Sequence, residues 1–327
     1  MSSSSLSFLR PEVLELKKKL DNFVEQDCIP AEEEFAKHLE RRHGADRWTM
    51  SAIPPCLERL KAKAKSLGLW NLFIPPHLIP KIPDPSLAPK IPLSYREYGI
   101  LCESLGRCPH LAPEACNTSA PDTGNMEVLL EFGTESQKQK YLLPLLRGEI
   151  RSTFLMTEPD VASSDPTNLE TKLSKLVNAF GRGQQLQVAE YTLTGRKWWS
   201  TGAMDPRCRL ALVVAKMDYS DPSCHGSGGQ KGTNNNKHGA HTIVAVEMPH
   251  PSVIMKRPLT VCGYDDAPHG HAEVVLDNIR LGESDLILGE GSGFRVSQAR
   301  LGPGRIHHCM RAIGMSKYKC FCHGLLQ

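Results

Sequence analysis

The spacing of apolar residues along this chain changes near residue 151, from a helical period to a period of two. The proline-rich residues 75–93 predict a loop, and Pro30 is expected to bend the first helix. Thr134 is expected to cap the helix that begins at residue 135. The helices predicted before the change lie at residues 11–42, 55–67, 94–105, 125–132 and 135–146.

Alternating apolar and polar residues after the change predict a β domain. The predicted strands are residues 151–157, 169–177, 189–196, 209–217, 241–248, 252–257 and 272–281. Helical spacing returns after residue 293, pauses at residues 302–305 and is not sustained beyond residue 315. The pattern predicts an α+β protein with three domains. They are an N-terminal helical domain at 1–150, a central β domain at 151–282 and the start of a C-terminal helical domain at 283–327.

The composition is that of an ordinary globular protein, with 40% hydrophobic and 23% charged residues among 327. A net charge of +3 is too small to predict binding to nucleic acid or to a membrane surface. No apolar run is long enough to predict a membrane span, and the first residues do not form a clear targeting signal. The 11 cysteines are an odd number and fit no zinc spacing well, so we expect reduced thiols and no metal.

Two polar runs follow apolar, β-like stretches and are the strongest candidates for a binding site. Backbone N–H groups at a strand end and a threonine hydroxyl can hydrogen-bond a flat heterocycle, while an indole packs on its face. The first run holds Met156, Thr157, Glu158, Pro159, Ser163, Ser164 and Asp165. The second holds Lys197, Trp198, Trp199, Ser200, Thr201, Gly202 and Ala203.

This pair of runs resembles the two flavin-contacting segments of acyl-CoA dehydrogenases. The likeness spans residues 10–315 and is closest to the large members related to kinase-fused dehydrogenases. Four further blocks carry it: residues 120–127, 133–138, 263–272 and 300–310. It implies a helical domain, a central β-barrel and a C-terminal helical domain that is incomplete here.

The resemblance implies FAD as cofactor and α,β-dehydrogenation of a fatty acyl-CoA to a trans-2-enoyl-CoA, as in β-oxidation. A carboxylate takes the Cα proton while a hydride leaves Cβ for the flavin. By resemblance, Thr157 contacts the flavin with Met156 beside it, Trp199 lies against the ring and Thr201 hydrogen-bonds near N5. Ser163 or Ser164 touches the flavin or the substrate arm. Arg305 opens the final helix near the acyl-CoA pocket.

The position before that arginine is Gly304, where some members of the family carry the catalytic glutamate. Other members place the carboxylate further downstream, so the sequence identifies no catalytic base. The alternative hypothesis is therefore a catalytically inactive, truncated relative that lacks the base and part of the FAD site. The family implies a homo-oligomer, an electron-transferring flavoprotein or O2 as electron acceptor, and a mitochondrial or peroxisomal location, with a cytoplasmic one left open.

Several other polar groups are candidate sites. Glu158 and Asp160 resemble an acid–base pair, but turn carboxylates are commonly solvated, which favours a surface role. The glycines of residues 289–293 lack the GxGxxG register, which favours a turn before a helix. If residues 268–276 form a strand, His269 and His271 share one face of it, yet no third metal ligand is evident. The adjacent His307 and His308 face different directions on a helix, and one of them is a candidate to line the pocket near Arg305.

Overall fold

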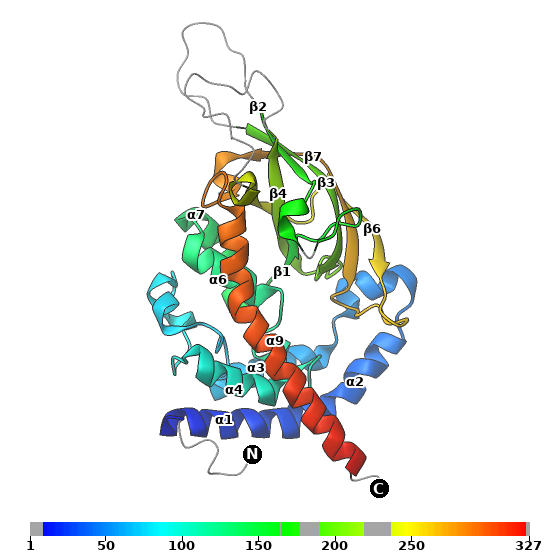
Figure 1. Cartoon of the computed structure of the whole chain (residues 1–327). Coiled ribbons are helices and arrows are strands. Elements are labelled where there is room, and N and C mark those ends of the chain that lie inside the picture. The colour runs from blue at the N-terminus through cyan, green and yellow to red at the C-terminus, as the bar shows by residue number, and fades with distance from the viewer. Residues whose placement is uncertain (1–8, 164, 177–189, 219–236, 325–327) are drawn as a thin grey trace, which may run out of the picture. The chain divides into compact units, whose positions relative to one another are not determined.

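The computed structural model describes residues 9–163, 165–176, 190–218 and 237–324. The chain divides into two compact units, whose elements are labelled in Figure 1. The helical unit comprises Met1–Glu131, Leu142–Gly148 and Arg300–Gln327, and the sheet unit comprises Phe132–Tyr141 and Glu149–Ala299. The three domain ranges expected from the sequence remain predictions.

Helices form where the apolar spacing predicts them in the helical unit. The bend expected near Pro30 is a π-helical turn, Val24–Cys28, which joins α1 to α2. Short 3-10 turns at Pro76–Lys81 and Pro85–Leu87 interrupt the expected loop at 75–93. The helices are α1 (Pro11–Phe23), α2 (Ile29–Glu40), α3 (Pro55–Leu67), α4 (Tyr95–Leu105), α5 (Ala112–Ala115), α6 (Asp122–Phe132) and α8 (Leu143–Arg147).

Thr134 caps α7 (Glu135–Gln137), as the sequence predicts. The Gln137 backbone N–H donates to the Thr134 hydroxyl, and the Thr134 N–H donates to Gln137 Oε1, which completes a reciprocal capping box. The Gln137 amide nitrogen also donates to the carbonyl oxygens of Ser284 and Leu286, at 2.8 and 3.1 Å. These bonds attach α7 to the sheet unit.

The C-terminal helix corrects two expectations. A single helix, α9 (Gly293–Gly324), runs through the expected turn at 302–305, so Arg305 lies within a helix and does not open one. Pro303 removes one backbone donor, but the neighbouring turns keep theirs, and the helix continues. Residues 316–323, which lack a sustained apolar period, contain no glycine or proline and extend the helix. Lys317 pairs with Glu103 of α4 at 2.8 Å, which attaches this extension to the helical unit.

Two glycines let α4 and α9 approach closely within the helical unit. A Cβ added at Gly106, which follows α4, would overlap the backbone carbonyl of Arg311. A Cβ added at Gly314 would overlap the carbonyl oxygen of Glu103. Van der Waals packing at this crossing therefore requires the absence of a side chain at both positions.

The sheet unit contains the predicted strands in the predicted order, joined in one eight-stranded sheet of the described chain. The sheet order is β6-β7-β3-β2-β4-β5-β8, and β1 pairs with β4 in parallel. The short β8 was not predicted. The strands are β1 (Arg151–Leu155), β2 (Lys172–Leu176), β3 (Glu190–Thr201), β4 (Cys208–Asp218), β5 (His241–Glu247), β6 (Val253–Leu259), β7 (His271–Gly282) and β8 (Leu286–Ile287).

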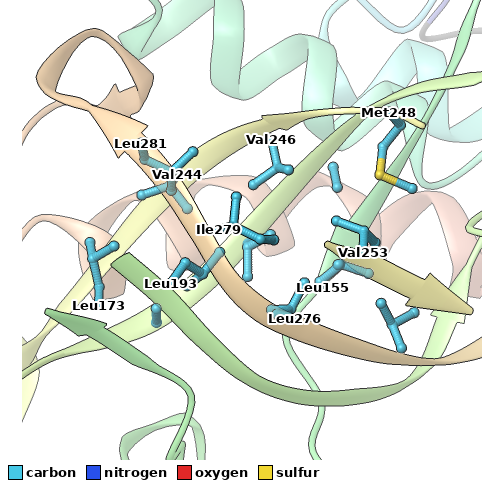
Figure 2. Packing of buried hydrophobic residues seen from close by; sticks show 14 of the residues in the cluster. Leu155, Leu173, Leu193, Val244, Val246, Met248, Val253, Leu276, Ile279 and Leu281 are labelled. Carbon is cyan, nitrogen blue, oxygen red and sulfur yellow. The ribbon is translucent and has the colours of Figure 1, made fainter. Parts of the chain in front are cut away.

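Side chains from all eight strands meet in one hydrophobic cluster, seen from close by in Figure 2. Leu155, Leu193 and Leu276 come from β1, β3 and β7 and are at most 1% exposed. The alternation along each strand brings these residues to one face of the sheet, as the period of two predicts. No helix in the described residues is both long and apolar enough to cross a membrane.

Candidate functional site

The two polar runs lie side by side in the sheet unit. Met156 and Thr157 follow the last residue of β1, while the second run forms the end of β3. The Trp198 N–H donates to the Thr157 carbonyl at 3.0 Å, and the Thr153 hydroxyl donates to the Thr201 carbonyl at 2.9 Å. The structure therefore brings together Met156, Thr157, Trp199 and Thr201, which the sequence separates by about forty residues.

Trp199 is displaced from the regular ladder of the sheet. The register between β3 and β7 shifts between Lys197 and Ser200, and Trp199 has a φ of 49°. A bulge with positive φ is uncommon for a bulky residue and re-aims its side chain. The indole is 39% exposed, whereas Tyr191, near the other end of the same strand, is only 1% exposed. This exposure leaves an aromatic face available to a ligand.

Thr157 has two hydrogen-bond donors available for a ligand. Its carbonyl accepts from Trp198, but neither its hydroxyl nor its backbone N–H has a hydrogen-bond partner in the part of the chain that the structure describes. The residue is half-buried. Because buried polar groups are generally paired, a half-buried donor pair beside an exposed indole is chemically suited to a polar ligand edge.

Ser163 stabilises the turn that follows Thr157. Its Oγ accepts from the Glu158 N–H at 3.0 Å and donates to the Glu158 carbonyl at 3.2 Å. These bonds use the only proton of its hydroxyl, which makes Ser163 a support for the turn. Ser164, the other serine considered from the sequence, lies outside the described residues.

Glu158 corrects the expectation of a solvated carboxylate. It is 4% exposed and accepts from the Glu170 and Thr171 N–H groups at 2.7 and 3.0 Å. Lys197 Nζ lies 2.7 Å from its Oε1. Burial alone would raise the pKa of Glu158, but the charge and hydrogen bonds of Lys197 and its other donors outweigh burial and lower it. Glu158 is therefore an ionised structural carboxylate.

Lys197 stands in the second polar run, but its structural role was not predicted. It is completely buried and donates to Glu158 and to the carbonyl oxygens of Met156 and Val214, at 3.0 and 2.8 Å. All three ammonium protons are therefore used. Burial lowers the pKa of Lys197 to about 8. The sequence did contain an indication of this burial. Lys197 lies two residues after Gly195 and four after Leu193, so the alternation along β3 places it on the same face as buried Leu193.

The helical unit contains a separate cavity, of about 350 Å3. Arg305 and Gly304 both line it from α9, and a Cβ added at Gly304 would meet nothing within 4 Å. Ala120 and Pro121 contribute from just before α6, and Thr123 and Gly124 from its start. The residues from α9 are Arg300, Leu301, His307, His308, Cys309 and Arg311. The cavity combines several basic groups with small residues.

The two adjacent histidines both line this cavity but differ in burial. His307 is 2% exposed and packs edge-on against Tyr98, with ring centroids 4.6 Å apart. Burial, with the nearby charge of Arg311, lowers the pKa of His307 to about 3, so it is neutral at physiological pH. His308 is exposed, and partial desolvation together with the nearby charges of Arg311 and Arg300 lowers its pKa as well.

The remaining candidates have other partners. His269 Nδ1 lies 2.8 Å from Asp205, and His271 Nδ1 lies 3.0 Å from the Thr201 hydroxyl. No group of three or more metal-ligating side chains occurs among the described residues. Residues 289–292 form a turn with positive φ at Gly289 and Gly291, and α9 begins at Gly293. The sequence interpretation of this glycine-rich run as a turn is confirmed.

The fold and these two runs match a known family. Residues 10–149 match the N-terminal domain of acyl-CoA dehydrogenases, and residues 153–279 match their middle domain. A solved putative acyl-CoA dehydrogenase from Mycobacterium abscessus is 38% identical, with a TM-score of 0.77 over 94% of this chain and 68% of that one. The chain therefore belongs to the acyl-CoA dehydrogenase family.

Curated relatives include larger members of the family. The probable acyl-CoA dehydrogenase IBR3 of Arabidopsis thaliana is 42% identical over 94% of this chain, and human acyl-CoA dehydrogenase family member 11 is 40% identical over 91%. This chain spans only 35% and 33% of those two proteins. The expected relationship to this branch of the family is confirmed, and members of the family are typically FAD-binding oxidoreductases.

Proposed function

We propose that this chain binds FAD and takes part in the α,β-dehydrogenation of a fatty acyl-CoA. The observation that supports it is the juxtaposition of Thr157, with its unpartnered donors, and the exposed indole of Trp199. Thr201, at the end of the same strand, supplies a hydroxyl to the same region. The donors and the aromatic face fit the polar edge and the flat ring of a flavin.

In this proposal, each residue has a separate task. Thr157 donates to the flavin edge, Met156 contacts the ring beside it, and Trp199 packs against its face. Ser163 holds the turn after Thr157, and Ser164 is a candidate for the substrate arm. FAD, when bound, supplies the acceptor for the hydride that leaves the acyl chain.

The acyl-CoA is assigned to the cavity of the helical unit that Arg305 lines. A guanidinium binds carbonyl or phosphate oxygens by charge-assisted hydrogen bonds, which suits a thioester or CoA ligand. Loss of the Cα proton requires a base, and Gly304 supplies no carboxylate at the position that some members use. The electron acceptor is an electron-transferring flavoprotein in a mitochondrion or O2 in a peroxisome, and the active form is a homo-oligomer.

Gly304 also supports a second candidate function, that of a non-catalytic relative. Such a protein would retain the flavin-facing residues of the sheet unit and the cavity of the helical unit, but would not turn over acyl-CoA. Flavin binding and flavin bleaching separate the two functions, because the first requires only the site and the second requires a base.

The visible absorption spectrum of the purified protein, recorded with and without added FAD, tests the proposal. A bound oxidised-flavin band that bleaches with an acyl-CoA is the result expected for a dehydrogenase. A band that does not bleach supports the non-catalytic relative. No bound flavin at micromolar FAD contradicts the dehydrogenase and also fits the non-catalytic relative, which would bind flavin poorly or not at all.

A pair of matched variants tests whether the flavin binds at this site. Trp199→Ala is expected to weaken FAD binding by about 5- to 150-fold, because stacking on a ring is worth roughly 1–3 kcal/mol. Tyr264→Ala is the control, since Tyr264 is a 79% exposed aromatic of the same sheet unit outside the two runs. Equal affinities in both variants would show that the flavin binds elsewhere.

A further inference from the structure

Thr201 and His271 form a cross-strand pair at the end of β3. They are register partners on β3 and β7, and Thr201 Oγ1 lies 3.0 Å from His271 Nδ1. The Trp199 and His271 rings lie 6.1 Å apart, so the imidazole borders the region assigned to the flavin. Opposed residues on neighbouring strands commonly interact in this way.

The hydrogen bond between Thr201 and His271 can form in two ways, which differ in the residue that donates the proton. If Nδ1 carries a proton, the imidazole donates to Thr201, and the hydroxyl proton is free to be donated elsewhere. If Nδ1 is unprotonated, Thr201 donates to the imidazole, and its oxygen can then only accept. The tautomer of His271 therefore determines what the Thr201 hydroxyl offers to a ligand.

A carboxylate lies near the other ring nitrogen of His271, that of Asp266. Its Oδ2 lies 3.4 Å from His271 Nε2, on the side of the ring opposite Thr201. The contact has the distance of an ion pair and not the geometry of a hydrogen bond, so Asp266 acts through its negative charge, which favours the ring proton on Nε2. With the proton on Nε2, Nδ1 is left as an acceptor for the Thr201 hydroxyl.

We propose that His271, oriented by Asp266, is a positioning residue that makes Thr201 a hydrogen-bond acceptor toward the ligand. This inference rests on the proposed flavin function. A hydrogen-bond acceptor at Thr201 favours a ligand that presents an N–H group to this hydroxyl. Reduced flavin carries a proton at N5, and oxidised flavin does not. Thr201 therefore favours the reduced cofactor over the oxidised one.

The tautomer is measured first, in the protein without flavin. Long-range proton–nitrogen NMR of histidine-labelled protein, at a pH where the ring is neutral, distinguishes a protonated from an unprotonated Nδ1. His271 signals are assigned by their loss in His271→Phe. An unprotonated Nδ1 with a proton on Nε2 is the expected result. A proton on Nδ1 overturns the proposal.

The midpoint potential of bound FAD is measured next. In His271→Phe, the Thr201 hydroxyl proton is released to donate to oxidised flavin, so the potential is expected to fall. A tenfold change in the ratio of affinities corresponds to about 30 mV for a two-electron couple. His271→Asn retains an acceptor atom at the Nδ1 position and is expected to restore the potential to within about 10 mV of the wild type, a third of that shift.

His250→Phe is the matched control. His250 lies in the same unit, where its Nδ1 accepts from the Ser252 N–H at 3.1 Å, outside the two polar runs. An unchanged potential in His271→Phe, or an equal fall in the control, contradicts the proposal. If the wild type binds no FAD, the proposed function fails, and the tautomer measured without flavin still decides the orientation of Thr201.

Discussion

Lys197 Nζ lies 2.7 Å from Glu158 Oε1, and the two side chains are 0% and 5% exposed. The pair connects four segments of the sheet unit, because Lys197 also binds the carbonyls of Met156 and Val214 and Glu158 binds the N–H groups of residues 170 and 171. It thereby fixes the turn that carries Thr157. A buried charge without its partner is costly, so the pair is expected to be needed for the order of the site.

Replacing one partner should destabilise the sheet unit strongly. Lys197→Met leaves the Glu158 carboxylate buried without its counter-ion, and we expect a loss of about 3–5 kcal/mol in the free energy of unfolding measured in urea. The control is Lys140→Met, which breaks the pair with Glu247 whose side chains are 53% and 62% exposed. That loss should stay below about 1 kcal/mol. Similar losses in both variants would mean that the buried pair has no special structural role.

Glu127 predicts a pH dependence in the helical unit. Its carboxyl is 6% exposed, and burial raises its pKa to about 8 although Arg300 opposes this. Between its ordinary value of 4.5 and about 8, the unfolded chain releases the proton while the folded chain retains it. Stability therefore falls as the pH rises through this window.

Glu127→Gln should remove this dependence. The variant is expected to gain at least about 1 kcal/mol relative to wild type between pH 5 and pH 8, as judged by chemical unfolding at each pH. Glu131→Gln is the control in the same helix, because Glu131 is 39% exposed and pairs with Lys81. Parallel profiles for the wild type and Glu127→Gln would show that Glu127 ionises normally in the folded state.

The glycines of α9 should respond in opposite directions to alanine. Gly314→Ala places a methyl group against the Glu103 carbonyl, and we expect a loss of about 1–3 kcal/mol from overpacking. Gly304→Ala meets nothing within 4 Å, and we expect a gain of about 0.5–1 kcal/mol from reduced backbone entropy. Thermal unfolding of both variants tests the close approach of α4 and α9. A stabilised Gly314→Ala would contradict it.

Helices and strands were predicted correctly where the spacing of neighbouring apolar residues is enough to define them. Thr134 and Gln137 form the expected capping box, and the β strands begin within three residues of their predicted positions. The helix through Pro303 was not predicted, because a proline between two glycines normally indicates the end of a helix. Its continuation depends on tertiary packing, such as the contacts of Gly314 and Lys317 with α4.

The site was predicted in part for the same reason. Thr157 and Trp199 stand in short motifs, and the sheet brings their segments together. The pairing of Glu158 with Lys197 joins residues 39 positions apart, and no local pattern distinguishes a buried carboxylate at a turn from a solvated one. The bulge that exposes Trp199 depends on the register between β3 and β7, which the sequence of β3 alone does not specify.

Gly304 gives a prediction about catalysis, because it lines the cavity with Arg305 and leaves open space where a side chain would begin. If the absence of a base there limits turnover, Gly304→Glu should restore a carboxylate and raise the rate of flavin bleaching by an acyl-CoA. General-base catalysis contributes about 10²–10⁴-fold, and an increase of at least about 100-fold is expected.

Gly302→Glu is the matched control for this gain of activity. It adds the same carboxylate two residues away, also with nothing within 4 Å of the new Cβ, at a position that does not line the cavity. Stopped-flow absorbance of the flavin band after mixing with acyl-CoA measures the rate in each protein. Rapid bleaching in the wild type would show that a base already acts from another position. Equal rates in the two glutamate variants would show that the cavity does not hold the reacting carbon.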